Sequence, residues 1–228
     1  VICARISNMR ITDLAAGMKR RPIYWLTLIA LAPRLVAAVF SGGYFAQDDH
    51  FLVIEAAQSW VDGFDYNNWL PWNQGADPMP TGHMMLYPGL HFLLFKLCAW
   101  AGLTDPSWKM VLVRLLHALW SLITVRVGYR IALRLSGAEV AWQCGLLLAL
   151  LYFMPFLAVR NLVEMVSMPP LMLSAWWLLR DGERPKANSL VVAGMFACLA
   201  VDLRFQAAFF GCGAGLALLL KKDVRGAL

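Results

Sequence analysis

The feature of this sequence that most constrains its fold is a series of apolar blocks, each about 15 to 20 residues long. A helix of that length is long enough to cross the hydrocarbon core of a membrane, which is about 30 Å thick. Composition agrees, because 60% of the 228 residues are hydrophobic and only 15% are charged. We therefore predict an all-α fold, a polytopic transmembrane helical bundle with about six spans. The predicted spans are 23–40, 110–131, 140–157, 162–179, 190–203 and 205–220.

A further apolar block, Met84–Leu103, is interpreted as an interfacial or re-entrant helix on the outer face. It carries Lys96 near its middle, and a charge at the bilayer centre costs about 2.5 to 3.5 kcal/mol on insertion scales. Basic residues accumulate in loops that stay in the cytoplasm. When the block is excluded from the spans, every basic cluster falls on the cytoplasmic side. These clusters are Arg5, Arg10, Lys19, Arg20 and Arg21; Arg130 and Arg134; Arg180, Arg184 and Lys186; and Lys221, Lys222 and Arg225.

This topology divides the chain into three parts. Residues 1–22 form a basic cytoplasmic N-terminus, residues 23–220 form a transmembrane module with an outer loop at 41–109, and residues 221–228 begin a cytoplasmic loop. We expect the chain to be the N-terminal part of a longer protein, because it opens on Val1 and stops inside a basic cluster. The net charge of +6 then follows from topology, and we predict no nucleic-acid partner.

The outer loop carries the candidate catalytic residues. No Lys or Arg occurs between Leu35 and Phe95, whereas several carboxylates do. Asp48 and Asp49 lie at the mouth of the first span and form a candidate catalytic carboxylate pair. The alternative is a solvated helix start, where acidic residues are favoured by the helix dipole.

An amphipathic helix is predicted just after the first span. Its polar arc holds Asp48, Glu55, Gln58, Ser59 and Asp62, and Val53, Ile54, Ala57, Trp60 and Val61 lie opposite. We expect this helix to lie along the membrane surface with its apolar side toward the lipid. The aromatic and amide residues that follow, among them Trp69, Trp72 and Asn73, suit the faces and hydroxyls of a sugar. An interfacial aromatic belt is the alternative.

Two arginines are predicted on the outer side of the membrane, where the fork of a guanidinium binds phosphate well. Arg160 opens the fourth span and precedes Glu164 by one turn, and Arg204 lies at a turn beside Asp202. Local ion pairs, Arg160 with Glu164 and Arg204 with Asp202, are the alternative for each.

The order of these features resembles that of the GT-C superfamily, which comprises multi-span glycosyltransferases that use polyprenyl-phosphate sugar donors. Members carry an acidic pair in the first outer loop, and Asp48 and Asp49 within 44–51 match it. The resemblance continues with a tyrosine-proline element at Tyr87, a polar element at 160–164 and an arginine at Arg204. Here no proline precedes the acidic pair, unlike the His-Pro-Asp-Glu pattern of some branches.

The resemblance implies transfer of a sugar from a polyprenyl-phosphate donor to an acceptor hydroxyl on a glycan, lipid or protein. Asp48 or Asp49 would be the catalytic base. The implied substrate-binding residues are His50, Glu55, Tyr87, Arg160, Glu164 and Arg204. A divalent metal held by Asp49 and Glu164 is possible in such enzymes, and no other cofactor is implied.

The expected location is a bacterial inner membrane, with the site facing the periplasm. The chief alternative is a secondary transporter or channel whose carboxylates form an acidic outer vestibule. Transporters usually place ionisable residues near the bilayer midplane. A structural partner subunit is the third hypothesis.

Overall fold

The computed structural model describes residues 17–75, 82–182 and 184–221, so the basic residues predicted at Arg5, Arg10, Lys222 and Arg225 lie outside it. Within these ranges the regular structure is entirely helical, which confirms the predicted all-α class. The elements are α3 (Pro22–Phe40), α4 (Gln47–Asp49), η1 (His50–Glu55), α5 (Ala56–Val61), η2 (Pro71–Asn73), α6 (Leu86–Trp100), α7 (Pro106–Ser136), α8 (Ala138–Leu150), α9 (Met154–Leu157), α10 (Val163–Leu179), α11 (Ala187–Leu203), η3 (Phe205–Ala207) and α12 (Ala208–Leu220).

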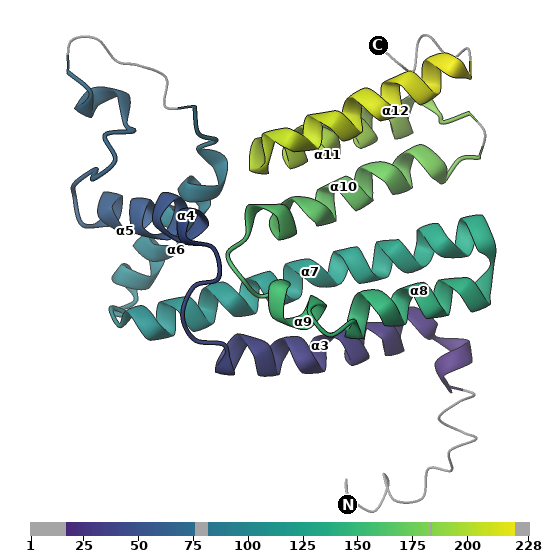
Figure 1. Ribbon diagram of the computed structural model, residues 1–228, viewed down its shortest axis with the longest axis horizontal. Coiled ribbons are helices and arrows are strands. Elements are labelled where there is room, and N and C mark those ends of the chain that lie inside the picture. The colour runs from purple at the N-terminus through teal and green to yellow at the C-terminus, as the bar shows by residue number, and fades with distance from the viewer. Residues whose placement is uncertain (1–16, 76–81, 183, 222–228) are drawn as a thin grey trace, which may run out of the picture.

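The long helices α3, α7, α8, α10, α11 and α12 run side by side, and each is antiparallel to the next in the chain (Figure 1). This alternation brings the basic ends together. Arg21 directly precedes α3, Arg134 lies in the last turn of α7 and Arg180 follows α10, all at one end of the bundle, whereas α4 with Asp48 and Asp49 lies at the other. The charge separation predicted from the sequence is therefore present in the fold.

Two stretches are long and apolar enough to cross a membrane, namely Pro22–Phe40 and Pro106–Leu150. Gly137, with φ of 85°, divides the second stretch into α7 and α8. The helices α10, α11 and α12 are apolar but shorter. Each of the six predicted spans contains helix here. Among the described residues, however, only two stretches have the length and composition of a membrane span, and together they include two of the predicted spans and most of a third.

One predicted span ends early. The helix expected over 140–157 stops at Leu150, and the short helix α9 follows after a turn. Pro155 lies in the first turn of α9, and it lacks the backbone N–H that a helix continuing from α8 would need at this position. In contrast, Pro169 and Pro170 both lie inside the continuous helix α10.

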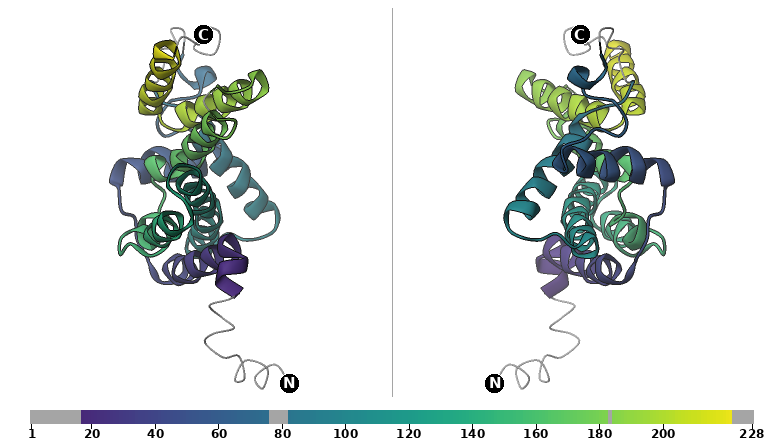
Figure 2. Two further views of the ribbon diagram at one scale, coloured as in Figure 1. Left: turned by 90° about the vertical axis from the view of Figure 1, so that its right-hand side faces the viewer. Right: turned by 90° about the vertical axis from the view of Figure 1, so that its left-hand side faces the viewer.

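The predicted surface helix is present as α4, η1 and α5, and with α6 it lies across one end of the bundle (Figure 2). Its apolar residues Val53, Ile54 and Ala57 are buried. They pack against residues of α6, α7 and α10, including Phe95 and Val166. The expectation that this side faces lipid was therefore wrong, because α6 and the bundle cover it.

Helix α6 has 15 residues and is about 22 Å long at 1.5 Å per residue, which is shorter than the hydrocarbon core. Lys96 is exposed on it, whereas His91 and Phe95 are buried toward α7. These features fit the prediction that this block does not span the membrane.

A buried arginine ties the first three long helices together. Arg34 of α3 is 2% exposed. Its guanidinium donates to Ser121 Oγ on α7 at 3.0 Å and to the carbonyl oxygens of Leu148 and Ala149 at 3.0 and 2.9 Å. These carbonyls belong to the last turn of α8, where no further helical N–H can reach them. Arg34 thus stabilises the end of a helix that water cannot reach.

Candidate active site

The centre of the candidate site is Asp49, which is held by the segment that leads into α10. Its Oδ2 atom accepts a hydrogen bond from the backbone N–H of Val163 at 3.1 Å, and its carbonyl oxygen accepts one from the side chain of Asn161 at 2.7 Å. Val163 is the first residue of α10, so the carboxylate lies at the positive end of a helix dipole. Among the described residues, Oδ1 has no hydrogen-bond partner and remains able to accept a proton.

Glu164 and Arg204 form an ion pair next to Asp49. Arg204 Nη2 lies 2.8 Å from Glu164 Oε1, and both side chains are partly exposed. The pair joins the start of α10 to the end of α11. Arg204 therefore pairs with a residue 40 positions earlier rather than with its neighbour Asp202, which was the local alternative. A guanidinium is thus placed beside the candidate base.

The surroundings of Asp49 shift its pKa. Burial raises the pKa above its ordinary value, the hydrogen bond from Val163 lowers it, the negative charges of Glu164 and Asp48 raise it, and Arg204 lowers it. The net direction is upward. A raised pKa makes the carboxylate a stronger base once it is ionised.

Asp48, the other member of the predicted pair, is exposed and precedes the turn of helix that carries His50. His50 Nε2 lies 3.2 Å from Glu55 Oε1, and its ring stacks on Tyr44 at a centroid distance of 5.0 Å. The structure therefore brings Asp49, Glu164 and Arg204 together, and it places His50 and Glu55 as a separate pair on the same loop.

Arg160 occupies a different environment from the one expected of a phosphate ligand. It is 6% exposed, and its Nη atoms donate to the carbonyl oxygens of Gly42 and Gly43, just after α3. Its guanidinium lies over the ring of Phe156, 4.4 Å from the centroid. It forms no ion pair with Glu164, whose described partner is Arg204. The geometry favours a structural role for Arg160.

Two residues of this site were missed by the sequence analysis, His117 and Asn161. The hydroxyl of Tyr87 lies 2.6 Å from His117 Nε2 and 2.6 Å from Asn161 Oδ1. A signal for His117 existed, because a polar residue inside a predicted span is costly and is a functional candidate by default. Asn161 lay within the polar element of the resemblance but had no assigned role. Tyr87, expected to bind substrate, is 4% exposed.

The possible divalent metal does not fit the side chains in the described ranges. No three His, Cys, Asp or Glu residues there lie close enough to share an ion. Glu164 is occupied by the guanidinium of Arg204, and Oδ2 of Asp49 accepts from a backbone N–H. We derive no step that passes through a metal.

The aromatic and amide segment of the loop is ordered around Asp65. This carboxylate accepts hydrogen bonds from Trp60 Nε1 at 3.0 Å, Leu70 N at 2.8 Å and Asn73 Nδ2 at 3.3 Å. Trp72 is 77% exposed, whereas Trp69 is buried and stacks on His83. Asp77 and its neighbours at 76–81 lie outside the described residues.

Apolar antiparallel helices with carboxylates and an arginine gathered at one end form a helical bundle of the kind found in integral membrane proteins. The chain belongs to the Alg9-like mannosyltransferase family, whose model matches residues 25–226. Members of this family are GT-C-type integral membrane glycosyltransferases, which confirms the resemblance inferred from the sequence.

A relative, Mannosyltransferase APTG1 of Arabidopsis thaliana, is 31% identical over 114 residues. The match covers 50% of this chain and 20% of the plant protein, so the chain spans well under two thirds of that relative. No solved structure gave a significant match.

We predict that Arg160 contributes more to the stability of the protein than Arg204 does. Arg160→Gln removes the hydrogen bonds that a buried guanidinium donates to two carbonyl oxygens, and a hydrogen bond that involves a charged group contributes about 1.5 to 3 kcal/mol. Arg204→Gln breaks a partly exposed ion pair worth about 1 kcal/mol or less. Thermal unfolding of the full-length protein in detergent should therefore show a clearly lower midpoint for Arg160→Gln alone. Equal midpoints in the two variants would contradict the structural role of Arg160.

Proposed function

We propose that the protein is a membrane mannosyltransferase that moves a sugar from a polyprenyl-phosphate donor to an acceptor hydroxyl at the non-cytoplasmic face. The observation that carries this proposal is the cluster of Asp49, Glu164 and Arg204 at the end of the bundle opposite the basic loops. Family membership supports the reaction class, and the name of the plant relative supports mannose as the sugar.

The proposed reaction inverts the anomeric centre. The carboxylate of Asp49 takes the proton of the acceptor hydroxyl, whose oxygen forms a bond to the anomeric carbon. The bond from that carbon to the phosphate oxygen breaks, and polyprenyl phosphate leaves with the electron pair. Arg204 stabilises the negative charge that develops on the phosphate. Asp48 is the second candidate base, but its exposure makes it the weaker one.

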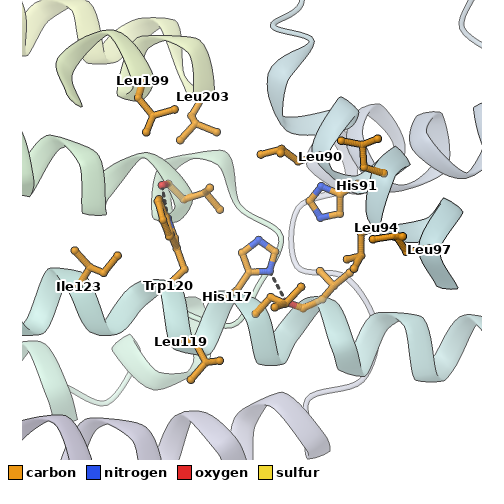
Figure 3. Close-up of a pocket in the computed structure, with 14 residues that line it drawn as sticks. Leu90, His91, Leu94, Leu97, His117, Leu119, Trp120, Ile123, Leu199 and Leu203 are labelled. Atoms are coloured by element: carbon orange, nitrogen blue, oxygen red, sulfur yellow. Dashed lines mark hydrogen bonds between the residues drawn. The ribbon is translucent and has the colours of Figure 1, made fainter. Parts of the chain in front are cut away.

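An apolar groove beside the cluster suits the isoprenoid tail of the donor. Its volume is about 670 Å³, and α6, α7, α10 and α11 line it. Figure 3 shows Leu199 and Leu203 of α11 facing Trp120 of α7, with Leu90 and Leu94 of α6 across the groove. Leu203 directly precedes Arg204. A tail in this groove would leave the phosphate near that arginine.

A second and more polar cavity lies on the other side of the outer loop. Its volume is about 530 Å³, and His50, Glu55, Gln58, Asp62 and Lys109 are among its lining residues. Hydroxyl groups of a glycan acceptor would find carboxylate and amide partners there. We propose this cavity for the acceptor, with His50 and Glu55 as its binding residues.

The compartment that the site faces is a further part of the proposal, and it depends on the membrane in which the protein lies. Its outer face is the periplasm if the protein is bacterial, as the sequence suggested, and the lumen of an internal membrane if it comes from a eukaryote such as the plant of the relative. The transporter alternative is less well supported, because the ionisable residues of the cluster lie at the bundle end rather than at its middle.

The direct test of the catalytic base compares Asp49→Asn with Asp48→Asn in the full-length protein. We expect Asp49→Asn to lower kcat for mannosyl transfer from a polyprenyl-phosphate donor at least about 100-fold, because general base catalysis contributes roughly 10² to 10⁴. Asp48→Asn, a matched change in the neighbouring residue, should lower it far less. Wild-type kcat in Asp49→Asn would contradict the assignment.

The raised pKa of Asp49 predicts the pH dependence. A base acts only when it is ionised, so activity falls as the pH drops through its pKa, and this fall should lie above the ordinary Asp value of 3.8. Glu164→Gln removes a negative charge that raises the pKa, so the fall should move to lower pH. The measurement is kcat/KM against pH for both proteins. A fall that moves upward in Glu164→Gln would contradict the electrostatic account.

The groove is tested by filling it. Leu199→Trp should raise KM for a long-chain polyprenyl donor about tenfold, which corresponds to a loss of about 1.4 kcal/mol, and change KM little for a donor with a two-isoprene tail. Met195→Trp is the control, because Met195 is on the same helix, is 67% exposed and does not line the groove. The same KM in both variants would show that the tail binds elsewhere.

A further inference from the structure

A chain of buried hydrogen bonds connects Asp49 to the interior of the bundle. The hydroxyl of Tyr87 on α6 bridges His117 on α7 and the side chain of Asn161, at 2.6 Å from each, and Asn161 donates to the backbone carbonyl of Asp49 at 2.7 Å. Tyr87 and His117 are 4% and 8% exposed. Four separate segments of the chain thus meet through side chains that water scarcely reaches.

The amide nitrogen of Asn161 donates to a carbonyl oxygen, so its Oδ1 atom faces the hydroxyl of Tyr87. Nδ1 of His117 lies 2.8 Å from the carbonyl oxygen of Val113, so the neutral imidazole carries its hydrogen on Nδ1 and presents Nε2 as an acceptor. The one hydrogen of the Tyr87 hydroxyl therefore lies between two acceptors, Nε2 of His117 and Oδ1 of Asn161. Figure 3 shows this ring on α7 close to His91, and the two rings stack with centroids 5.9 Å apart.

Asp49, which carries the proposed chemistry, is held at two points beside this chain of hydrogen bonds. Asn161 holds the backbone of Asp49, and two residues later the N–H of Val163 holds its carboxylate. The segment 161–163 therefore fixes both ends of the same aspartate. Tyr87 and His117 in turn fix Asn161 against the bundle, so a loss of the Tyr87 hydroxyl would release that segment without touching the carboxylate.

We propose that Tyr87, His117 and Asn161 are positioning residues, which hold the carboxylate of Asp49 in the orientation that removes the proton of the acceptor. The proposal rests on the proposed function of Asp49. It assigns a role to two residues, His117 and Asn161, that the sequence did not single out, and it gives Tyr87 a role other than contact with substrate. A misplacement of about 1 Å is enough to cost a catalytic group on the order of 100-fold in rate.

The central experiment compares Tyr87→Phe with Tyr129→Phe in the full-length protein. Both tyrosines are 4% exposed, and Tyr129 belongs to the apolar cluster between α3, α7 and α8, with no hydrogen bond among the described residues. We expect Tyr87→Phe to lower kcat at least tenfold while KM for donor and acceptor stays within twofold. Tyr129→Phe should keep wild-type kcat. Equal kcat values in the two variants would overturn the proposal.

Two further variants keep the proposal testable if Tyr87→Phe folds poorly. His117→Gln places an amide group, which can accept a hydrogen bond from the Tyr87 hydroxyl, close to the position of Nε2, whereas His117→Leu offers no polar group there, so kcat should be at least fivefold higher in His117→Gln than in His117→Leu. Asn161→Ala changes a residue outside the helices and should lower kcat with KM unchanged. If kcat decreases across these variants only in proportion to the decrease in the midpoint of thermal unfolding, the role of these residues is purely structural and the proposal is overturned.

The outcomes separate this proposal from the proposed function. Absence of transfer by the wild-type protein, or full transfer by Asp49→Asn, would contradict the proposed function itself. An inactive Asp49→Asn together with wild-type kcat in Tyr87→Phe and Asn161→Ala would contradict only the positioning role.

Discussion

The carbonyl groups at helix ends that water cannot reach must accept hydrogen bonds from donors within the protein, and the fold depends on this constraint. Buried arginines meet this need at two places. Arg34 donates to the last turn of α8, and Arg114 donates to the carbonyl of Ala38 in the last turn of α3 at 2.6 Å. A third buried arginine, Arg160, donates to the carbonyls of the exposed residues Gly42 and Gly43, which follow α3. An unpaired carbonyl in an apolar environment costs several kcal/mol. The same bonds that satisfy these ends also fix where the outer loop leaves the bundle.

The position of the candidate site follows from that constraint. Because Arg160 holds the start of the outer loop, the loop turns back over the end of the bundle, and Asp49 reaches the first turn of α10. There the N-terminus of α10 supplies a backbone donor, and α11 supplies Arg204. The outer arginines therefore have different tasks. Arg160 donates to backbone carbonyls, whereas Arg204 lies beside the carboxylates and is partly exposed, so it is able to bind a phosphate.

The sequence predicted the features that depend on length and charge. The apolar blocks gave the helices, the basic clusters gave their alternation, and the segment at 48–62 gave the helix across the bundle end. What it could not give depends on tertiary contacts. The apolar side of that helix was assigned to lipid because periodicity identifies a buried face but not what covers it. Likewise, a guanidinium is equally suited to phosphate and to carbonyl oxygens, so only packing distinguishes Arg160 from Arg204.

We propose above all that the outer cluster around Asp49 binds a polyprenyl-phosphate sugar. The most direct measurement is an experimental structure of the full-length protein with a non-transferable phosphonate analogue of the donor. We expect the phosphonate to lie against Arg204, the isoprenoid tail to lie between α6, α7 and α11, and Oδ1 of Asp49 to face the anomeric carbon from the acceptor side. A donor bound at the opposite end, near Arg130 and Arg134, would contradict the proposal.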